Sequence, residues 1–158
     1  MSPTKKSDSH RQTSKVSSSK MVKCNVSLKS RYTEGIDMKV FIADDSQVMR
    51  ERIIEMLSEL PQIEIIGQAE DGLQATNLIE KLNPDVAILD IRMPRGNGID
   101  VLQNIKKNNP ALTVIMLTNY PYPQYRKKCM KAGADYFFDK STEFEKVTLV
   151  LKELILSR

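Results

Sequence analysis

The chain has 158 residues, 28% of them charged, and a formal net charge of +4 at neutral pH. This length allows one ordinary domain or one domain with a tail, and no apolar stretch reaches the ~20 residues that a membrane-spanning helix needs. The two cysteines, Cys24 and Cys129, have no metal-binding or disulfide spacing, so we expect a reducing, cytoplasmic environment.

Residues 1–37 form a basic tail rich in serine and lysine. They hold eight basic and three acidic residues, a balance of +5, whereas residues 38–158 have a balance of −1. The tail has few large apolar side chains to offset the entropy of ordering, so we predict that it is disordered. A weak arm for nucleic acid or an anionic membrane is the alternative, but we expect neither partner. Translation could start at Met1, Met21 or Met38.

From residue 38 onward, hydrophobic periodicity predicts strands that alternate with helices. In chain order the predicted elements are strand 39–43, helix 48–60, strand 63–69, helix 71–82, strand 86–89, helix 99–107, strand 112–117, helix 124–132, strand 136–138 and a last helix with apolar residues from 144 to 155. Ser46 is a predicted helix N-cap, Asp71 is expected to open its helix, and Ser141 or Thr142 is the predicted cap of the last helix. Such alternation predicts an α/β fold, a doubly wound parallel sheet of five strands with helices on both faces.

The segment 86–98, VAILDIRMPRGNG, is the most informative stretch of the domain. Four apolar residues lead directly into Asp90, and a loop with Pro94, Gly96 and Gly98 follows. An apolar run bounded by turn residues is typical of a strand buried on both faces. A carboxylate at the end of such a strand requires solvent, a partner or a metal. An acid that only caps the next helix is the alternative for this strand considered alone.

Four of the five predicted strands deliver a polar side chain to the same edge of the sheet. Strand 39–43 is followed by Asp44 and Asp45. The third, fourth and fifth predicted strands lead to Asp90, Thr118 and Lys140, respectively. The carboxyl ends of parallel strands form the functional crevice of open α/β sheets. Three carboxylates within ~5 Å would repel each other by roughly 3 kcal/mol per pair at an effective dielectric of ~20, so the cluster needs a cation.

These residue types predict a magnesium-dependent phosphoryl acceptor. Oxygen ligands without His or Cys select a hard cation, and a few carboxylates with water and phosphate suit Mg²⁺. The Lys140 ammonium can pair with a phosphoryl oxygen, and the Thr118 hydroxyl can donate to another. A carboxylate placed between these groups, Asp90, can attack phosphorus and form an aspartyl phosphate.

At these positions the chain resembles the receiver domain of two-component response regulators, and in particular stand-alone chemotaxis receivers. The resemblance covers residues 38–158 and depends on ordered motifs. The matching positions are Asp44 and Asp45, Asp90 with Met93, Pro94 and Gly98, Thr118, Lys140, and Phe137 three residues before the lysine. It implies a flavodoxin-like sheet of order 2-1-3-4-5. It also implies a single-domain response regulator that a partner histidine kinase or phosphotransfer protein phosphorylates.

The resemblance assigns a role to each site residue. Asp44, Asp45, Asp90 and the backbone carbonyl of Arg92 would bind Mg²⁺, with Asp44 acting partly through water. Thr118 and Phe137 would form the conformational switch. Arg92 and Tyr120 flank the approach of water to the phosphoryl group and would tune dephosphorylation.

The chain ends after the last predicted helix, so we expect no enzymatic or DNA-binding output in this sequence. The domain would assist its own phosphorylation and dephosphorylation and would signal through a downstream protein or a homodimer. The expected surface consists of helix 124–132, strand 136–138 and the last helix.

Three alternatives were compared with this prediction. A haloacid dehalogenase-type phosphatase requires a second acid where Arg92 stands, and a flavin-binding domain would not place Asp44 and Asp45 beside a phosphate. A degenerate receiver that is never phosphorylated and serves only in protein interactions remains the third.

Overall fold

The computed structural model describes residues 37–158. Of the predicted tail only Asp37 falls within this range, so the prediction of disorder lies outside the described residues apart from that position. Within the described range, no helix is both long and apolar enough to cross a membrane.

A five-stranded sheet forms the centre of the domain, with every neighbouring pair of strands parallel and in the order β2-β1-β3-β4-β5. The strands are β1 (Met38–Ala43), β2 (Ile63–Ala69), β3 (Val86–Leu89), β4 (Thr113–Thr118) and β5 (Tyr136–Asp139). This confirms the predicted α/β fold with strand order 2-1-3-4-5.

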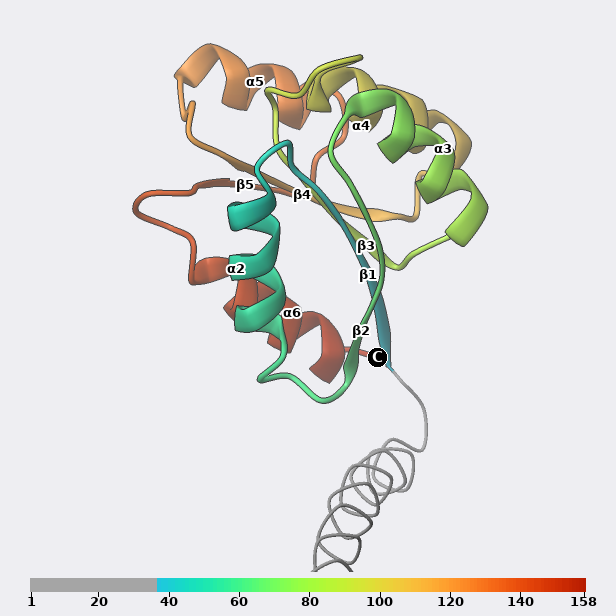
Figure 1. The fold of residues 1–158 in the computed structure, drawn as a ribbon, viewed down its shortest axis with the longest axis vertical. Helices are drawn as coiled ribbons and strands as arrows, with labels where there is room; N and C mark the ends of the chain where they lie inside the picture. Colours follow the sequence, from blue (N-terminus) through green and yellow to red (C-terminus); the bar gives the residue numbers. More distant parts are fainter. Residues whose placement is uncertain (1–36) are drawn as a thin grey trace, which may run out of the picture. The chain divides into compact units, whose positions relative to one another are not determined.

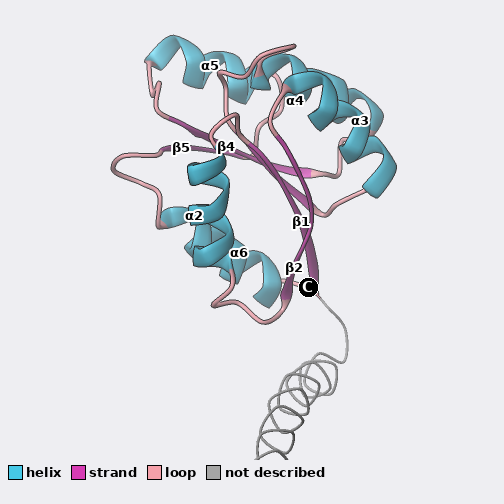
Figure 2. Cartoon of the chain, viewed as in Figure 1, coloured by secondary structure: helices cyan, strands magenta, loops and turns pink. Residues whose placement is uncertain are grey.

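Helices cover both faces of this sheet. They are α2 (Gln47–Leu57), α3 (Gly72–Leu82), α4 (Gly98–Asn108), α5 (Pro123–Lys131) and α6 (Lys146–Leu156). Helices α2 and α6 lie on one face, and α3, α4 and α5 lie on the other (Figure 1, Figure 2). Helices α2 to α5 each connect two parallel strands, and such a connection has to cross a face of the sheet, whereas α6 follows the last strand.

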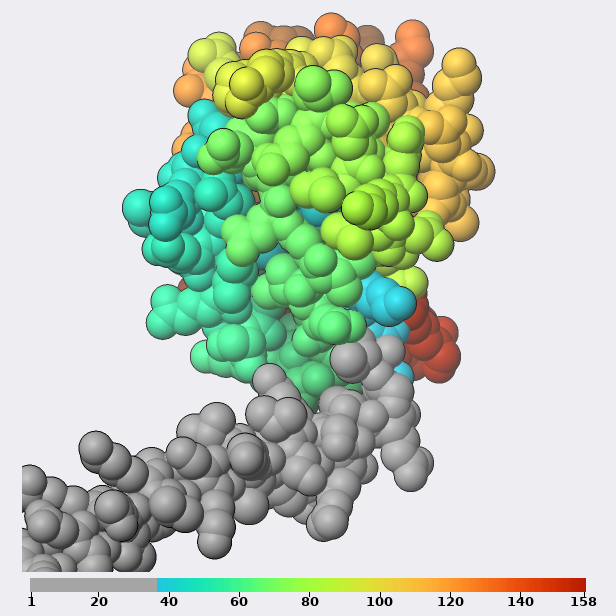
Figure 3. Space-filling view, turned by 45° about the vertical axis from the view of Figure 1, so that its right-hand side comes forward, coloured from blue at the N-terminus to red at the C-terminus, as the bar shows by residue number. Residues whose placement is uncertain are grey.

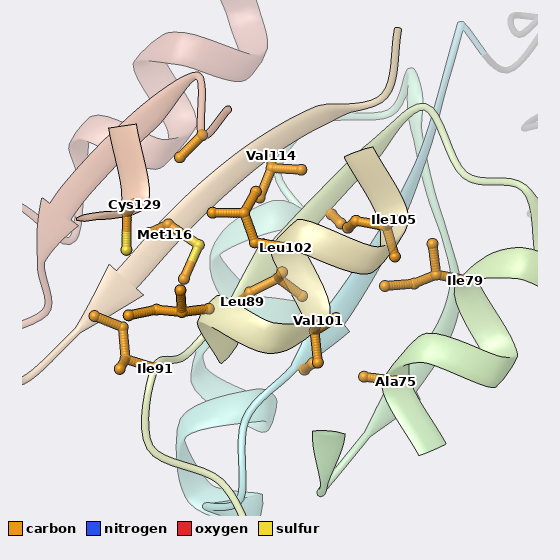
Figure 4. Packing of buried hydrophobic residues seen from close by; sticks show 14 of the residues in the cluster. Ala75, Ile79, Leu89, Ile91, Val101, Leu102, Ile105, Val114, Met116 and Cys129 are labelled. Atoms are coloured by element: carbon orange, nitrogen blue, oxygen red, sulfur yellow. The ribbon is translucent and has the colours of Figure 1, made fainter. Parts of the chain in front are cut away.

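The sheet separates two hydrophobic clusters. Leu89, Leu102 and Met116 belong to the cluster beneath α3, α4 and α5 (Figure 4). Ile53 and Val147 belong to the cluster beneath α2 and α6. Since β3 is central and contacts both clusters, all four of its residues are buried. Each fully buried aliphatic side chain contributes roughly 1.5–3 kcal/mol, so this strand is a rigid support for the residue that follows it.

The predicted N-cap Ser46 occurs in the structure, Asp71 caps the helix that it was expected to open, and the predicted cap of the last helix is wrong. The side chains of Ser46 and Asp71 accept hydrogen bonds from the third residue of their helices. Neither Ser141 nor Thr142 caps the last helix, which begins at Lys146. Instead both hydroxyls donate to the carboxylate of Asp139, at 2.7 and 3.1 Å. Asp139, two residues before Ser141 and three before Thr142, therefore holds both hydroxyls in a turn, and the helix begins later.

Candidate functional site

Five polar or charged residues are buried within residues 37–158, and four of them were predicted site residues. These four are Asp44, Asp90, Thr118 and Lys140, with exposed fractions of 6% or less. Ladder-type hydrogen bonds hold their backbones at the ends of the strands. The Asp44 N–H donates to the Ala69 carbonyl at 3.0 Å, the Asp90 N–H to Ala43 at 2.9 Å, and the Lys140 N–H to Thr118 at 2.9 Å.

The acids form one cluster at the carboxyl edge of the sheet. Carboxylate oxygens of Asp44, Asp45 and Asp90 lie within 4.8 Å of one another. The ammonium of Lys140 lies 2.5 Å from Asp44 Oδ2 and 3.1 Å from Asp90 Oδ2. One cation is thus shared by two buried carboxylates, while Asp45 is exposed to solvent. The cluster keeps an excess of negative charge, which a further cation would relieve.

Burial strongly affects the ionisation of Asp90. Desolvation raises the pKa of Asp90 to about 6, and the nearby charge of Asp44 adds to this effect. The Lys140 ammonium opposes the rise because it favours the ionised form. With a pKa of about 6, Asp90 binds a proton in mild acid, and this proton competes with any cation for the carboxylate.

The donor set suits a hard divalent cation. The three clustered groups offer only carboxylate oxygens, and the exposed position of Asp45 leaves room for water ligands. This combination favours Mg²⁺ over metals that prefer nitrogen or sulfur ligands. The Arg92 carbonyl, the fourth predicted ligand, lies two residues after Asp90 in the loop between β3 and α4.

Glycine at position 98 allows this loop to turn back onto Asp90. A Cβ atom at residue 98 would lie 1.8 Å from the carbonyl oxygen of Asp90. The Gly98 N–H donates to the Ile91 carbonyl at 2.7 Å, and the Ile91 N–H donates to Asp90 Oδ1 at 2.8 Å. The Asp90 side chain is therefore held by the loop that it precedes.

The structure places the two predicted switch residues on neighbouring strands. Thr118 is fully buried, and its hydroxyl oxygen accepts a hydrogen bond from the Tyr120 N–H at 3.0 Å. Phe137 is buried in the cluster beneath α3, α4 and α5. The guanidinium of Arg126 lies 4.6 Å from the centre of the Phe137 ring and donates to the Phe137 carbonyl at 3.3 Å. Any outward rotation of this ring would require Arg126 to move.

Arg92 and Tyr120 come together from two different loops. The Arg92 guanidinium lies 4.0 Å from the centre of the Tyr120 ring, close enough for a cation–π interaction. A side-chain hydrogen bond with Tyr125 raises the pKa of Arg92. Arg92 also remains exposed to solvent.

One contributor to the site was missed at the level of sequence. Arg50, in the first turns of α2, donates to the backbone carbonyl of Asp44 at 2.6 Å and to the side chain of Gln68 at 3.1 Å. It thereby connects the acidic strand end to the helix and to β2. The sequence signal that could have identified Arg50 is its position six residues after Asp44. That spacing places the start of the helix close to the end of the strand.

Comparison with known proteins assigns the chain to one family. Residues 40–152 match the family model described as the response regulator receiver domain. A protein-glutamate methylesterase/protein-glutamine glutaminase from Pyrococcus horikoshii is 34% identical over 122 residues, which cover 76% of this chain and 32% of that protein. The transcriptional activator DevR/DosR of Mycobacterium tuberculosis is 29% identical over 117 residues, 74% of this chain and 54% of that protein. The chain thus spans about half or less of these relatives.

Solved structures agree with the family match. The response regulator domain of Thermotoga maritima CheB has a TM-score of 0.66 and 32% identity, with 76% of this chain and 94% of that chain covered. A chain in the CheX–CheY–BeF3–Mg²⁺ complex from Borrelia burgdorferi has a TM-score of 0.64 and 29% identity, with 72% and 89% covered.

Proposed function

This chain belongs to the response regulator receiver family, and from that premise we propose that Asp90 accepts a phosphoryl group from a phosphohistidine of a partner kinase or phosphotransfer protein. The observation that carries this proposal is the cluster at the sheet edge. Asp90 lies within 4.8 Å of two other acids and 3.1 Å from the Lys140 ammonium, as a phosphoryl acceptor requires.

Each residue has a distinct part in the proposed transfer. A carboxylate oxygen of Asp90 forms the new P–O bond while the P–N bond of the phosphohistidine breaks, and the imidazole leaves with the electron pair of that bond. Lys140 then exchanges a carboxylate contact for a phosphoryl oxygen, and the Thr118 hydroxyl donates to another. Asp44, Asp45, Asp90 and the Arg92 carbonyl would hold Mg²⁺, which supplies charge neutralisation for the acids and the incoming oxygens.

We propose that the phosphorylated domain binds its downstream partner through the face formed by α5, β5 and α6. Helix α5 carries Arg126, Lys127, Lys128 and Lys131, and the turn after β5 carries Glu143 and Glu145. This mixture of charges suits a self-complementary dimer or a partner with acidic groups opposite α5. The switch pair, Thr118 and Phe137, would connect the acceptor site to this surface.

A phosphodonor experiment tests the proposed function. We expect acetyl phosphate with millimolar Mg²⁺ to add one phosphoryl group per chain, measured by intact-mass spectrometry. We expect no addition when Mg²⁺ is removed by a chelator, and none in the variant Asp90→Asn. Asp135→Asn is the matched control, because this acid pairs with Lys106 at 2.9 Å elsewhere on the domain. Labelling that persists in Asp90→Asn would show that the acceptor is a different residue.

The same experiment separates this proposal from a degenerate receiver. A domain that serves only in protein interactions would stay unlabelled, and Mg²⁺ with beryllofluoride would leave its tyrosine fluorescence unchanged. An active site with three tyrosines on the neighbouring loop and helix, Tyr120, Tyr122 and Tyr125, should respond to this mimic.

The affinity for Mg²⁺ should depend on pH. Because burial raises the pKa of Asp90 to about 6, its carboxylate is protonated in acid and the proton must leave before the cation binds. We expect affinity to be constant above pH ~7 and to fall by up to about tenfold per pH unit below pH ~6. Calorimetric titration near pH 5, 6 and 7.5 measures this. An affinity that does not change across this range would contradict direct ligation by Asp90.

A further inference from the structure

Asp71 is the fifth buried polar or charged residue among those described, and it lies outside the acidic cluster. Its Oδ1 accepts a hydrogen bond from the Gln74 N–H at 2.7 Å and so caps α3. Its Oδ2 lies 3.1 Å from Nε and 2.9 Å from Nη2 of Arg95. One carboxylate therefore joins the start of α3 to a segment 24 residues away in the chain.

Arg95 belongs to the loop that follows Asp90, and its backbone conformation is unusual. Its φ is 53°, and the next residue, Gly96, has a φ of 102°. Within residues 37–158 only one other non-glycine residue, Asn83, has a positive φ, and it ends α3 as a C-cap. A positive φ is disfavoured for arginine, so the loop needs a contact that holds this shape. The charge-assisted contact with Asp71 provides it.

The backbone adds a second contact between the same two segments. The Gly72 N–H donates to the Pro94 carbonyl at 3.0 Å. A Cβ atom at residue 72 would lie 1.9 Å from the Gly96 carbonyl oxygen, so glycine is required for this close approach. In the space-filling view the yellow-green segment after β3 lies against the green atoms of α3 (Figure 3).

The opposite side of the loop is bound to the acceptor, through the Ile91 N–H and Asp90 Oδ1. Arg92 lies between this contact and the one made by Arg95, so the position of its carbonyl depends on both. We propose that Asp71 and Arg95 are positioning residues that hold the loop after Asp90 in the shape that binds a divalent cation. This inference rests on the proposed function, because it assumes that Asp90 and the Arg92 carbonyl bind Mg²⁺.

The sign of one measurement distinguishes positioning from electrostatics. Arg95 carries a positive charge, so its removal by itself would strengthen the binding of a cation nearby. Loss of positioning has the opposite effect. The variant Arg95→Asn removes the guanidinium while asparagine still tolerates a positive φ, and Asp71→Asn removes the charge while asparagine still caps the helix.

The experiment is calorimetric titration of the full chain with MgCl2. We expect Arg95→Asn and Asp71→Asn each to bind Mg²⁺ about threefold to tenfold more weakly than wild type, less than the 10–100-fold typical of a group that bonds a metal ligand directly. The double variant should be no weaker than either single variant, because both remove the same contact. Lys106→Asn is the matched control and should bind as wild type does, since its partner Asp135 lies elsewhere.

Two outcomes would overturn the inference. If Arg95→Asn binds Mg²⁺ as tightly as wild type or more tightly, while Asp90→Asn binds none, the magnesium site stands and the positioning role does not. If wild type itself binds no Mg²⁺, the proposed function and the positioning role both fail.

Discussion

The variant Lys140→Met is expected to lower the free energy of unfolding by about 3 kcal/mol at pH 8 without Mg²⁺. Lys140 is 4% exposed, and its ammonium contacts the buried carboxylates of Asp44 and Asp90. Methionine has a similar length but no charge, so the variant would leave two adjacent buried carboxylates without a cationic partner. Urea unfolding at equilibrium measures the loss.

The pH dependence of this loss identifies its cause. The pKa of Asp90 is already raised to about 6, above its value in the unfolded chain, and removal of Lys140 raises it further. A carboxyl group whose pKa is higher in the folded state than in the unfolded chain favours folding when it is protonated. As pH rises through the folded-state pKa, the group ionises and this contribution to the free energy of unfolding is lost. The destabilisation should therefore be small near pH 5 and largest above pH 7, and Mg²⁺ should reduce it.

Lys106→Met is the matched control for this prediction. Lys106 contacts one carboxylate, Asp135, whose side chain is 41% exposed, and such pairs contribute about 1 kcal/mol or less. We expect a small loss that varies little between pH 5 and 8. Equal losses in the two lysine variants would show that the acidic cluster is not strained by its own charge.

The arrangement of the sheet was predictable because it depends on local patterns. The apolar run from Val86 to Leu89 and its equivalents mark the strands, and the alternation with helices leaves few possible topologies. Residues placed directly after the strands, Asp44 and Asp90 among them, can be assigned to one edge of the sheet from the sequence alone. Their grouping follows from the geometry common to parallel sheets.

Contacts between segments distant in sequence were not predictable in this way. Asp71 was predicted only to open a helix, because its second contact is with Arg95, in a loop with an unusual backbone. The error at the start of α6 has a similar origin. Ser141 and Thr142 are typical caps, but Asp139 accepts hydrogen bonds from both hydroxyls. Local preference could not show which of two competing partners each hydroxyl would choose.

The lifetime of the phosphorylated protein is expected to be minutes to hours, and the pair Arg92 and Tyr120 should set it. Hydrolysis requires water in line with the bond to Asp90, on the open side of the phosphoryl group. The Arg92 guanidinium lies 4.0 Å from the centre of the Tyr120 ring, and the backbone of Tyr120 is held by the Thr118 hydroxyl at 3.0 Å. Neither side chain is an acid or amide that could orient an attacking water, and a guanidinium can hydrogen-bond the phosphoryl oxygens.

The variants Arg92→Asn and Tyr120→Glu test this by replacing the stacked pair with groups that can orient water. We expect decay of the phosphorylated protein, followed by mass spectrometry after removal of the phosphodonor, to accelerate at least about tenfold in the double variant, since a tenfold change needs only ~1.4 kcal/mol in the barrier. Tyr122→Glu is the matched control, because this ring is 51% exposed and its centre lies 6.3 Å from that of Tyr120. Decay of the wild type within seconds, or an equal effect of Tyr122→Glu, would mean that the stacked pair does not shield the phosphoryl group. A slow wild type that the double variant accelerates would place control of signal duration in these two side chains, and removal of the phosphoryl group in the cell would then depend on a partner protein.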